Sequence, residues 1–154
     1  MPSYLPRGAL TTLLINEMTA DGILMGDGVA PDAGGWDDDP NVPTSTYKPY
    51  LVLNPMAVAD PSGSFGDSSS DFRVPYSLMS SGISRKQCEV YSDKGRKVLA
   101  GLERAVVTLS TGGDWKIQQV RANSIGGVIR TDNTEPSEFT QTDVVTVYLS
   151  KEIS

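Results

Sequence analysis

The chain has 154 residues, of which 38% are hydrophobic and 21% charged, and its formal net charge is −6. This size and composition predict one soluble domain, residues 1–154, and exclude a wholly disordered chain, a disulfide-built mini-protein and a membrane-spanning helix, which needs ~18 consecutive apolar residues. Because the chain has no histidine and a single cysteine, Cys88, it lacks the Ser–His and Cys–His pairs of nucleophilic catalysis, the commonest metal ligand and any intramolecular disulfide.

The first predicted element is a helix over residues 7–19, followed by a short strand at residues 23–25. The apolar stripe of this helix consists of Leu10, Leu13, Leu14 and Met18. Residues 26–46 are rich in Gly, Pro and Asp. They predict a loop of about twenty residues, which is longer than the ~12–15 that compact domains normally contain without a functional reason.

Two strands come next, over residues 47–54 and 72–80, and a second long loop, residues 55–71, connects them. Together they predict a wide antiparallel hairpin. The second strand alternates apolar residues on one face with more polar residues on the other. Pro75 lies inside this strand, and because proline has no N–H to donate to the ladder, we expect an edge strand or a bulge there.

The clearest local signal is the start of a long helix at Ser84. Ser84 is a favoured N-cap, Gln87 occupies the capping-box position, and Ile83 and Cys88 can form a hydrophobic staple. The apolar stripe that extends this helix to near residue 109 consists of Cys88, Tyr91, Val98, Leu102 and Val106. Gly95 inside the helix costs roughly 1 kcal/mol relative to alanine, which a close neighbour must offset.

Two further strands are predicted over residues 115–122 and 143–149, with a turn-rich stretch between them. The order of helix, strands, long helix and strands predicts an α+β fold. We expect a mixed β-sheet of about four or five strands with two helices packed on one face and long loops.

Acidic residues are concentrated in residues 21–71, which hold nine aspartates and one base, Lys48. Residues 83–106 are locally basic. The acidic pI of about 4.5 argues against tight nucleic-acid binding. The acidic and basic regions could make electrostatic contacts with other protein subunits. From charge alone, however, the preferred explanation is that the acidic loops keep the protein soluble.

The long acidic loop contains the candidate residues Trp36, Asp37, Asp38 and Asp39. Calcium loops need oxygen ligands at alternating positions and a bidentate carboxylate further on. The three aspartates are contiguous, so a solvated acidic turn is favoured over a metal site. Trp36 lies in a loop too polar to bury it, and it either packs back under the domain or anchors a contact with another subunit.

Arg85 and Lys86 occupy the first turn of the long helix, where positive charge opposes the helix dipole. This placement indicates either an acidic partner or simple solvation. Cys88 falls on the apolar stripe, which favours a packed core thiol. We identify no catalytic, cofactor-binding or metal-binding residue, and we expect a protein that is not an enzyme.

The order of several short motifs carries a family resemblance. A W-D-x-x-P loop leads into a K-P-Y-hydrophobic strand, then come a G-x-F-x-D loop, an F-R-x-P-Y strand and a helix that opens S-R-x-Q and continues through D-K-x-R. In this order and spacing, about residues 30–100 resemble the tail terminator proteins of long-tailed phages that infect actinobacteria. The matching positions are Trp36, Asp37, Pro40, Lys48, Pro49, Tyr50, Gly63, Phe65, Asp67, Phe72, Arg73, Pro75, Tyr76, Ser84, Arg85, Gln87, Asp93, Lys94 and Arg96.

The resemblance implies a virion structural protein of the tail, assembled in the bacterial cytoplasm and working without a cofactor. Such a protein is expected to form a hexameric ring with copies of itself on the head-proximal end of the tail tube. There it would stop polymerisation of the major tail tube protein and contact the head–tail connector or neck proteins, while genomic DNA passes through without specific binding. The interface residues that we expect are Trp36, Asp37, Asp38, Asp39, Phe65, Asp67, Arg85 and Lys86.

Three alternatives stay open at this stage. The nearest is another neck or tail-completion protein of similar size. A small accessory domain that binds calcium or another ligand through its Asp-rich loop is a different class. A hydrolase built on carboxylates comes last, because most acids lie in loops with no apolar surroundings to shift their pKa values.

Overall fold

The computed structural model describes residues 5–57, 71–110, 113–131 and 137–151. Its elements in chain order are α1 (Arg7–Ala20), β1 (Met25–Asp27), β2 (Gly35–Trp36), β3 (Tyr47–Lys48), β4 (Tyr50–Pro55), β5 (Asp71–Gly82), α2 (Arg85–Ala100), β6 (Val106–Leu109), β7 (Gly113–Ser124), β8 (Ile129–Thr131) and β9 (Glu138–Lys151). Neither helix in these ranges is long and apolar enough to cross a bilayer.

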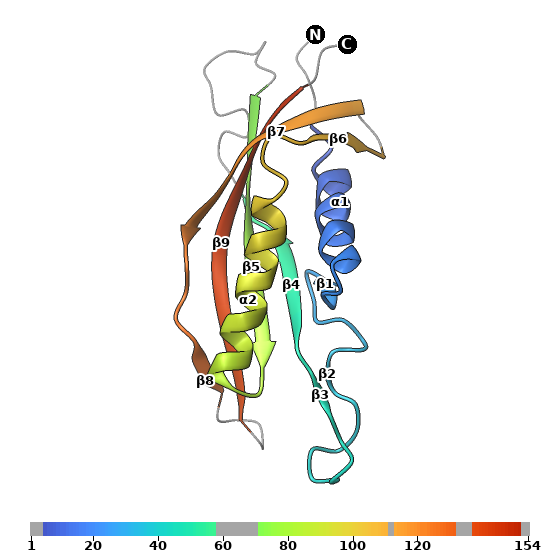
Figure 1. Cartoon of the computed structure of the whole chain (residues 1–154), viewed down its shortest axis with the longest axis vertical. Helices are drawn as coiled ribbons and strands as arrows, with labels where there is room; N and C mark the ends of the chain where they lie inside the picture. Colours follow the sequence, from blue (N-terminus) through green and yellow to red (C-terminus); the bar gives the residue numbers. More distant parts are fainter. Residues whose placement is uncertain (1–4, 58–70, 111–112, 132–136, 152–154) are drawn as a thin grey trace.

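The strands form a seven-stranded mixed sheet in the order β1-β4-β5-β9-β7-β6, with β8 also paired to β9, and a separate pair of β2 and β3. β1 and β4 are parallel, and every other pair is antiparallel. Both helices lie on one face of this curled sheet (Figure 1). The α+β class is confirmed, whereas the expected four or five strands are too few. The sequence assigned β6 to a helix and β8 to a turn-rich stretch.

The core lies between the two helices and the inner face of the sheet. α1 buries Leu10, Leu14 and Met18 there, as its sequence stripe predicts. The β5–β9 register places Val74 opposite Val147 and Tyr76 opposite Val145 on this face. Further along the same face the paired residues become polar, with Ser80 opposite Gln141. Ser80, Gln141 and the neighbouring Asp143 therefore form a small buried polar layer under α2.

Pro75 does not mark an edge or a bulge, so that prediction is wrong. β5 lies in the middle of the sheet, and its register with β9 is regular on both sides of Pro75. The Pro75 carbonyl accepts a hydrogen bond of 2.9 Å from the N–H of Met56, just past the end of β4. The N–H and C=O of a strand residue point to the same side, so an N–H at residue 75 would point toward the end of β4. The ladder between β5 and β9 therefore loses no hydrogen bond to the proline.

The helix that starts after Ser84 ends at Ala100, not near residue 109. Gly101 caps it, and Arg104 then adopts a positive φ of 68° that redirects the chain into β6. Val106 is exposed and Val107 is buried, as expected of alternation in a strand. The β-branched run of β6 overrides the apparent helical stripe.

Gly95 is required by close packing. A Cβ built on it would lie 2.6 Å from Leu51 Cδ1 and 3.0 Å from Leu78 Cδ2. The sequence prediction of a close neighbour at this position is therefore confirmed, and α2 can approach β4 and β5 closely at this point.

Candidate functional site

The long acidic loop forms a distinct feature, which we call the arm and define as residues 32–48. It leaves the sheet between β1 and β4 and extends past the sheet's lower end (Figure 1). β2 and β3 pair only with each other, with Trp36 opposite Tyr47. The loop expected over residues 26–46 contains β2 and the last two residues of β1. These short pairings are not visible in a composition rich in Gly and Asp.

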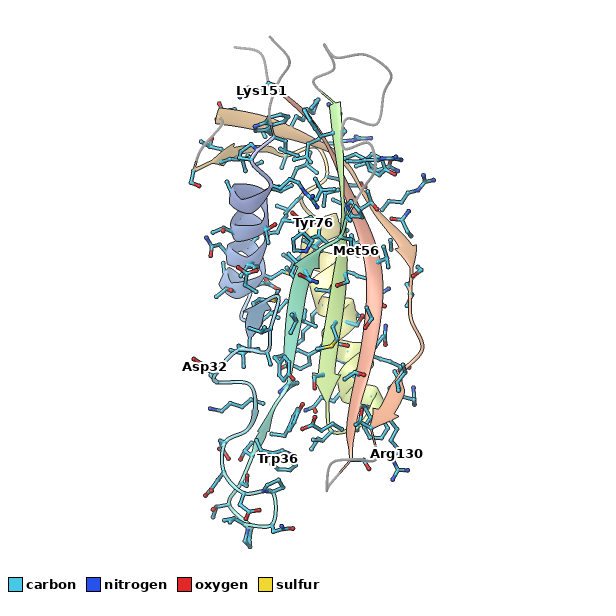
Figure 2. All side chains as sticks on the ribbon, turned by 180° about the vertical axis from the view of Figure 1, so that it is seen from behind. Asp32, Trp36, Met56, Tyr76, Arg130 and Lys151 are labelled. Atoms are coloured by element: carbon cyan, nitrogen blue, oxygen red, sulfur yellow. The ribbon has the colours of Figure 1, made fainter. Side chains whose placement is uncertain are left out.

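Trp36 packs within the arm itself (Figure 2). Its ring meets that of Tyr47 edge-on, with centroids 5.5 Å apart and planes at 78°, a favourable aromatic geometry. The hydroxyl of buried Tyr47 lies 2.6 Å from Ser81 Oγ, which ties the base of the arm to β5. Trp36 is half-buried, so part of the indole still faces solvent.

The three aspartates close the arm's loop by local hydrogen bonds. Asp37 Oδ1 accepts from the Thr46 N–H at 2.8 Å and from Ser45 Oγ at 3.2 Å. Asp38 Oδ1 accepts from the N–H of Asp39 at 2.7 Å, and Asp39 Oδ1 from that of Asn41 at 3.0 Å. The Thr46 N–H is the main cause that lowers the pKa of Asp37 below its usual value. These bonds shape the loop, and the described residues contain no group of three His, Cys, Asp or Glu side chains placed to hold a metal ion.

Arg85 and Lys86 are exposed at the start of α2. Ser84 accepts from the Gln87 N–H at 3.1 Å, as predicted, while Gln87 Oε1 accepts from the N–H of Ile83 at 2.9 Å. Arg85 forms an ion pair with Glu89 at 2.6 Å one turn further on. Such an exposed pair contributes little to stability.

The structure brings only some of the expected interface residues together. Trp36 and the three aspartates share the arm, whereas Arg85 and Lys86 lie on α2, and no ion pair joins the two groups within the described ranges. Phe65 and Asp67 lie outside the described residues.

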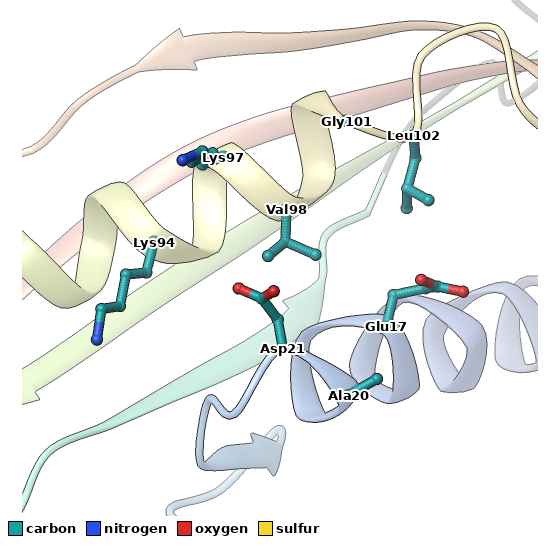
Figure 3. Close-up of a pocket in the computed structure, with 8 residues that line it drawn as sticks. All are labelled: Glu17, Ala20, Asp21, Lys94, Lys97, Val98, Gly101 and Leu102. Atoms are coloured by element: carbon teal, nitrogen blue, oxygen red, sulfur yellow. The ribbon is translucent and has the colours of Figure 1, made fainter.

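A groove between α1 and α2 was not anticipated from the sequence (Figure 3). It has a volume of about 590 Å³ and is lined by Glu17, Ala20, Asp21, Lys94, Lys97, Val98, Gly101 and Leu102. The two acids are Glu17 on α1 and Asp21, the C-cap of α1, and both lysines lie on α2. The groove therefore has one acidic and one basic wall, with apolar residues between them. The four charged residues of the groove are exposed and lie outside the predicted apolar stripes, so no local pattern marks them.

A buried polar cluster under α2 was also not predicted from the sequence. Asp143 is fully buried and accepts a hydrogen bond from Ser92. Its Oδ1 accepts from Gln141 Nε2 and from the Gly126 N–H, both at 3.0 Å. Arg96 Nε lies 3.3 Å from Asp143 Oδ2, within ion-pair range, but its N–H makes no hydrogen bond.

The geometry of this cluster fits a structural role. Ser92, Gln141 and Asp143 are closed over by α2 and the segment at Gly126, which leaves no open face to a substrate. Gln141 and Asp143 share the two-residue period of Val145, Val147 and Leu149, and this pattern in the sequence could have placed both on the buried face.

Cys88 is buried next to this cluster, with its Sγ 3.2 Å from Ser80 Oγ. Burial raises the pKa of the Cys88 thiol, so the sulfur stays protonated and is a poor nucleophile. The prediction of a packed core thiol is confirmed.

Comparison with known proteins adds little to this description. No protein-family model matches the chain, and no curated protein matches it. One solved chain, whose name describes no activity, has 13% sequence identity and a TM-score of 0.49 over 96% of this chain and 94% of that chain. A likeness this weak carries no argument about fold or function.

Proposed function

We propose that this chain is a virion structural protein of the tail-terminator type. It assembles with copies of itself into a hexameric ring on the head-proximal end of a phage tail tube. The ring ends polymerisation of the major tail tube protein and presents a surface to the head–tail connector. The ordered motifs of residues 30–100 support this assignment, and the arm is the structural observation that carries it.

The arm suits a contact between subunits. It projects from the sheet (Figure 1), and its exposed acids are Asp32, Asp37, Asp38 and Asp39. A closed ring of identical copies needs head-to-tail contacts between two different surfaces of each copy. The arm supplies one surface, and the exposed basic positions of α2 supply a complementary one.

The fold also supports a role that depends on shape. The α-helices and the seven-stranded sheet form one continuous core, which provides a rigid body from which loops make contacts. The net charge of −6 suits a ring through which DNA passes, because negative walls disfavour contact with phosphates.

The test is a tube-length assay. Purified major tail tube protein is allowed to polymerise with and without this protein, and the lengths are measured by electron microscopy. A terminator binds the growing end and shortens the length distribution, and the double variant Arg85→Glu/Lys86→Glu weakens this effect if the start of α2 meets an acidic neighbour. A control variant of equal charge, Lys116→Glu/Arg121→Glu on β7, keeps the effect. Tube lengths that are identical with and without the protein contradict the proposal.

A further inference from the structure

We propose that the arm of one copy docks into the groove between α1 and α2 of a neighbouring copy. This inference rests on the ring proposed above and names the two surfaces that form its repeated contact. The groove is occupied by the arm of a second copy of this chain, and the exposed Asp38 and Asp39 of that arm contact the groove.

The basic wall of the groove has charge available for a partner. Lys97 is exposed, and within the described part of the chain it makes no ion pair. Lys94 lies over the ring of Tyr91, with its Nζ 4.7 Å from the ring centroid, a contact that leaves the ammonium open to solvent on its other side. Both side chains line the same groove.

The arm is complementary to this wall in charge, and it carries an apolar residue that suits the groove's floor. Asp38 and Asp39 are exposed on its loop, and Val42 next to them is a partly exposed apolar residue, at 36%. The groove offers Val98 and Leu102 as an apolar floor beside the lysines. Val42 can therefore pack on this floor while the two carboxylates reach Lys94 and Lys97.

The loop is already held in one conformation. The hydrogen bonds of Asp37 to Thr46 and Ser45, of Asp38 to Asp39 and of Asp39 to Asn41 fix the backbone. A preorganised loop loses less conformational entropy on binding, so a small contact can be sufficient. In Figure 1 the arm extends downward, away from α1 and from the C-terminal half of α2, which line the groove, so the contact requires another copy.

The acidic wall of the groove sets the orientation. Glu17 on α1 and Asp21 at its C-cap face α2 across the groove (Figure 3). Because like charges repel, they disfavour an arm that enters with its aspartates on the α1 side. One orientation of the arm is thus favoured, as a ring with a fixed rotation between copies requires.

Reciprocal charge reversal tests the contact. Lys94→Glu/Lys97→Glu weakens self-association, measured by sedimentation across a concentration series, by about tenfold or more, because attraction becomes repulsion. Asp38→Asn/Asp39→Asn also weakens it, because the arm loses its charge while the amide oxygens still accept the hydrogen bonds of the loop. Asp38→Lys/Asp39→Lys is then added to Lys94→Glu/Lys97→Glu in one chain, so that a basic arm meets an acidic groove, and this quadruple variant regains association. The control Lys116→Glu/Arg121→Glu associates as the wild type does.

A disulfide trap gives a second readout, which reports whether two residues of neighbouring copies come into contact. The variant Asp38→Cys/Lys97→Cys is oxidised and run on a denaturing gel, and docking of arm into groove gives a ladder of linked chains. Asp38→Cys/Lys116→Cys is the control and gives no ladder. Buried Cys88 stays in both variants.

The outcomes separate the two proposals. If the wild type forms an oligomer but charge reversal has no effect and no ladder appears, the arm–groove contact is wrong and the ring stands. If the wild type is a monomer at every concentration and ionic strength, the ring fails, and the contact fails with it.

Discussion

The Arg7 guanidinium donates a hydrogen bond of 2.7 Å to the backbone carbonyl of Met56, whose own N–H donates to the carbonyl of Pro75. In a regular antiparallel ladder the N–H of residue 75 would bind the Met56 carbonyl. Proline has no N–H, and the first residue of α1 supplies the donor in its place. The start of α1 is therefore fixed to the sheet at the point where proline interrupts the pairing of β4 and β5.

This relationship predicts a coupling between Arg7 and Pro75. Arg7→Met lowers the free energy of unfolding by about 0.5–1.5 kcal/mol, the usual net value of one hydrogen bond. In the Pro75→Ala background the loss is smaller, because the new N–H of residue 75 can donate to Met56. A double-mutant cycle by urea denaturation measures the difference. Equal losses in both backgrounds would show that Arg7 does not substitute for the missing donor.

Gly95 gives a second prediction with a matched control. Gly95→Ala destabilises the protein by about 1–3 kcal/mol, because the new methyl overpacks the core against Leu51 and Leu78. Gly8→Ala in α1 stabilises it by up to about 1 kcal/mol through helix propensity, since a Cβ there meets nothing within 4 Å. Thermal unfolding of both variants is the measurement, and a stabilising Gly95→Ala would mean that α2 does not approach β4 this closely.

The buried cluster predicts a strong effect at Asp143 and a weak one at Asp93. Asp143→Asn costs about 3–5 kcal/mol, because it removes the buried charge that pairs with Arg96 and weakens the hydrogen bond that Ser92 donates. Asp93→Asn also removes an ion pair with Arg96, but an exposed one, and it costs about 0.2–1 kcal/mol. Denaturant unfolding compares the two variants. A similar small loss for both variants would show that the cluster does not hold α2 on the sheet.

Two buried tyrosines predict a loss of stability at high pH. Burial raises the pKa of Tyr47 and of Tyr76 from 10 to about 12. Between these values the unfolded chain has already lost the tyrosine protons that the folded chain keeps, so unfolding becomes more favourable as the pH rises. The stability that the two protonated tyrosines contribute is fully present below pH 10 and is lost as the pH approaches 12.

The variant Tyr76→Phe tests this pH dependence. It reduces the slope of stability against pH above pH 10, and the tyrosinate absorbance of the wild type rises together with unfolding. An unchanged slope in the variant would show that Tyr76 ionises equally well in the folded protein.

Local signals in the sequence predicted the starts of elements well. The cap at Ser84 and the apolar stripe of α1 depend on residues within one or two turns, and both appear as expected. The long strands β5 and β9 follow from their alternation and β-branched content. These elements can be predicted from the sequence because residues close together in the chain determine them.

The remaining features depend on residues far apart in the chain. α2 ends where the chain turns to form β6, which pairs with β7. Pro75 is tolerated because Arg7 supplies the donor that proline lacks. The groove exists only because α1 and α2 lie side by side on the sheet. Asp143 is stabilised by Ser92, 51 residues earlier, and no local pattern reveals such a partner.

Native mass spectrometry of the purified protein tests the central claim, self-association into a ring, most directly. We predict a closed species of six 16.5 kDa chains with no series of open oligomers of increasing length. A single 16.5 kDa species at every concentration and ionic strength would contradict the claim.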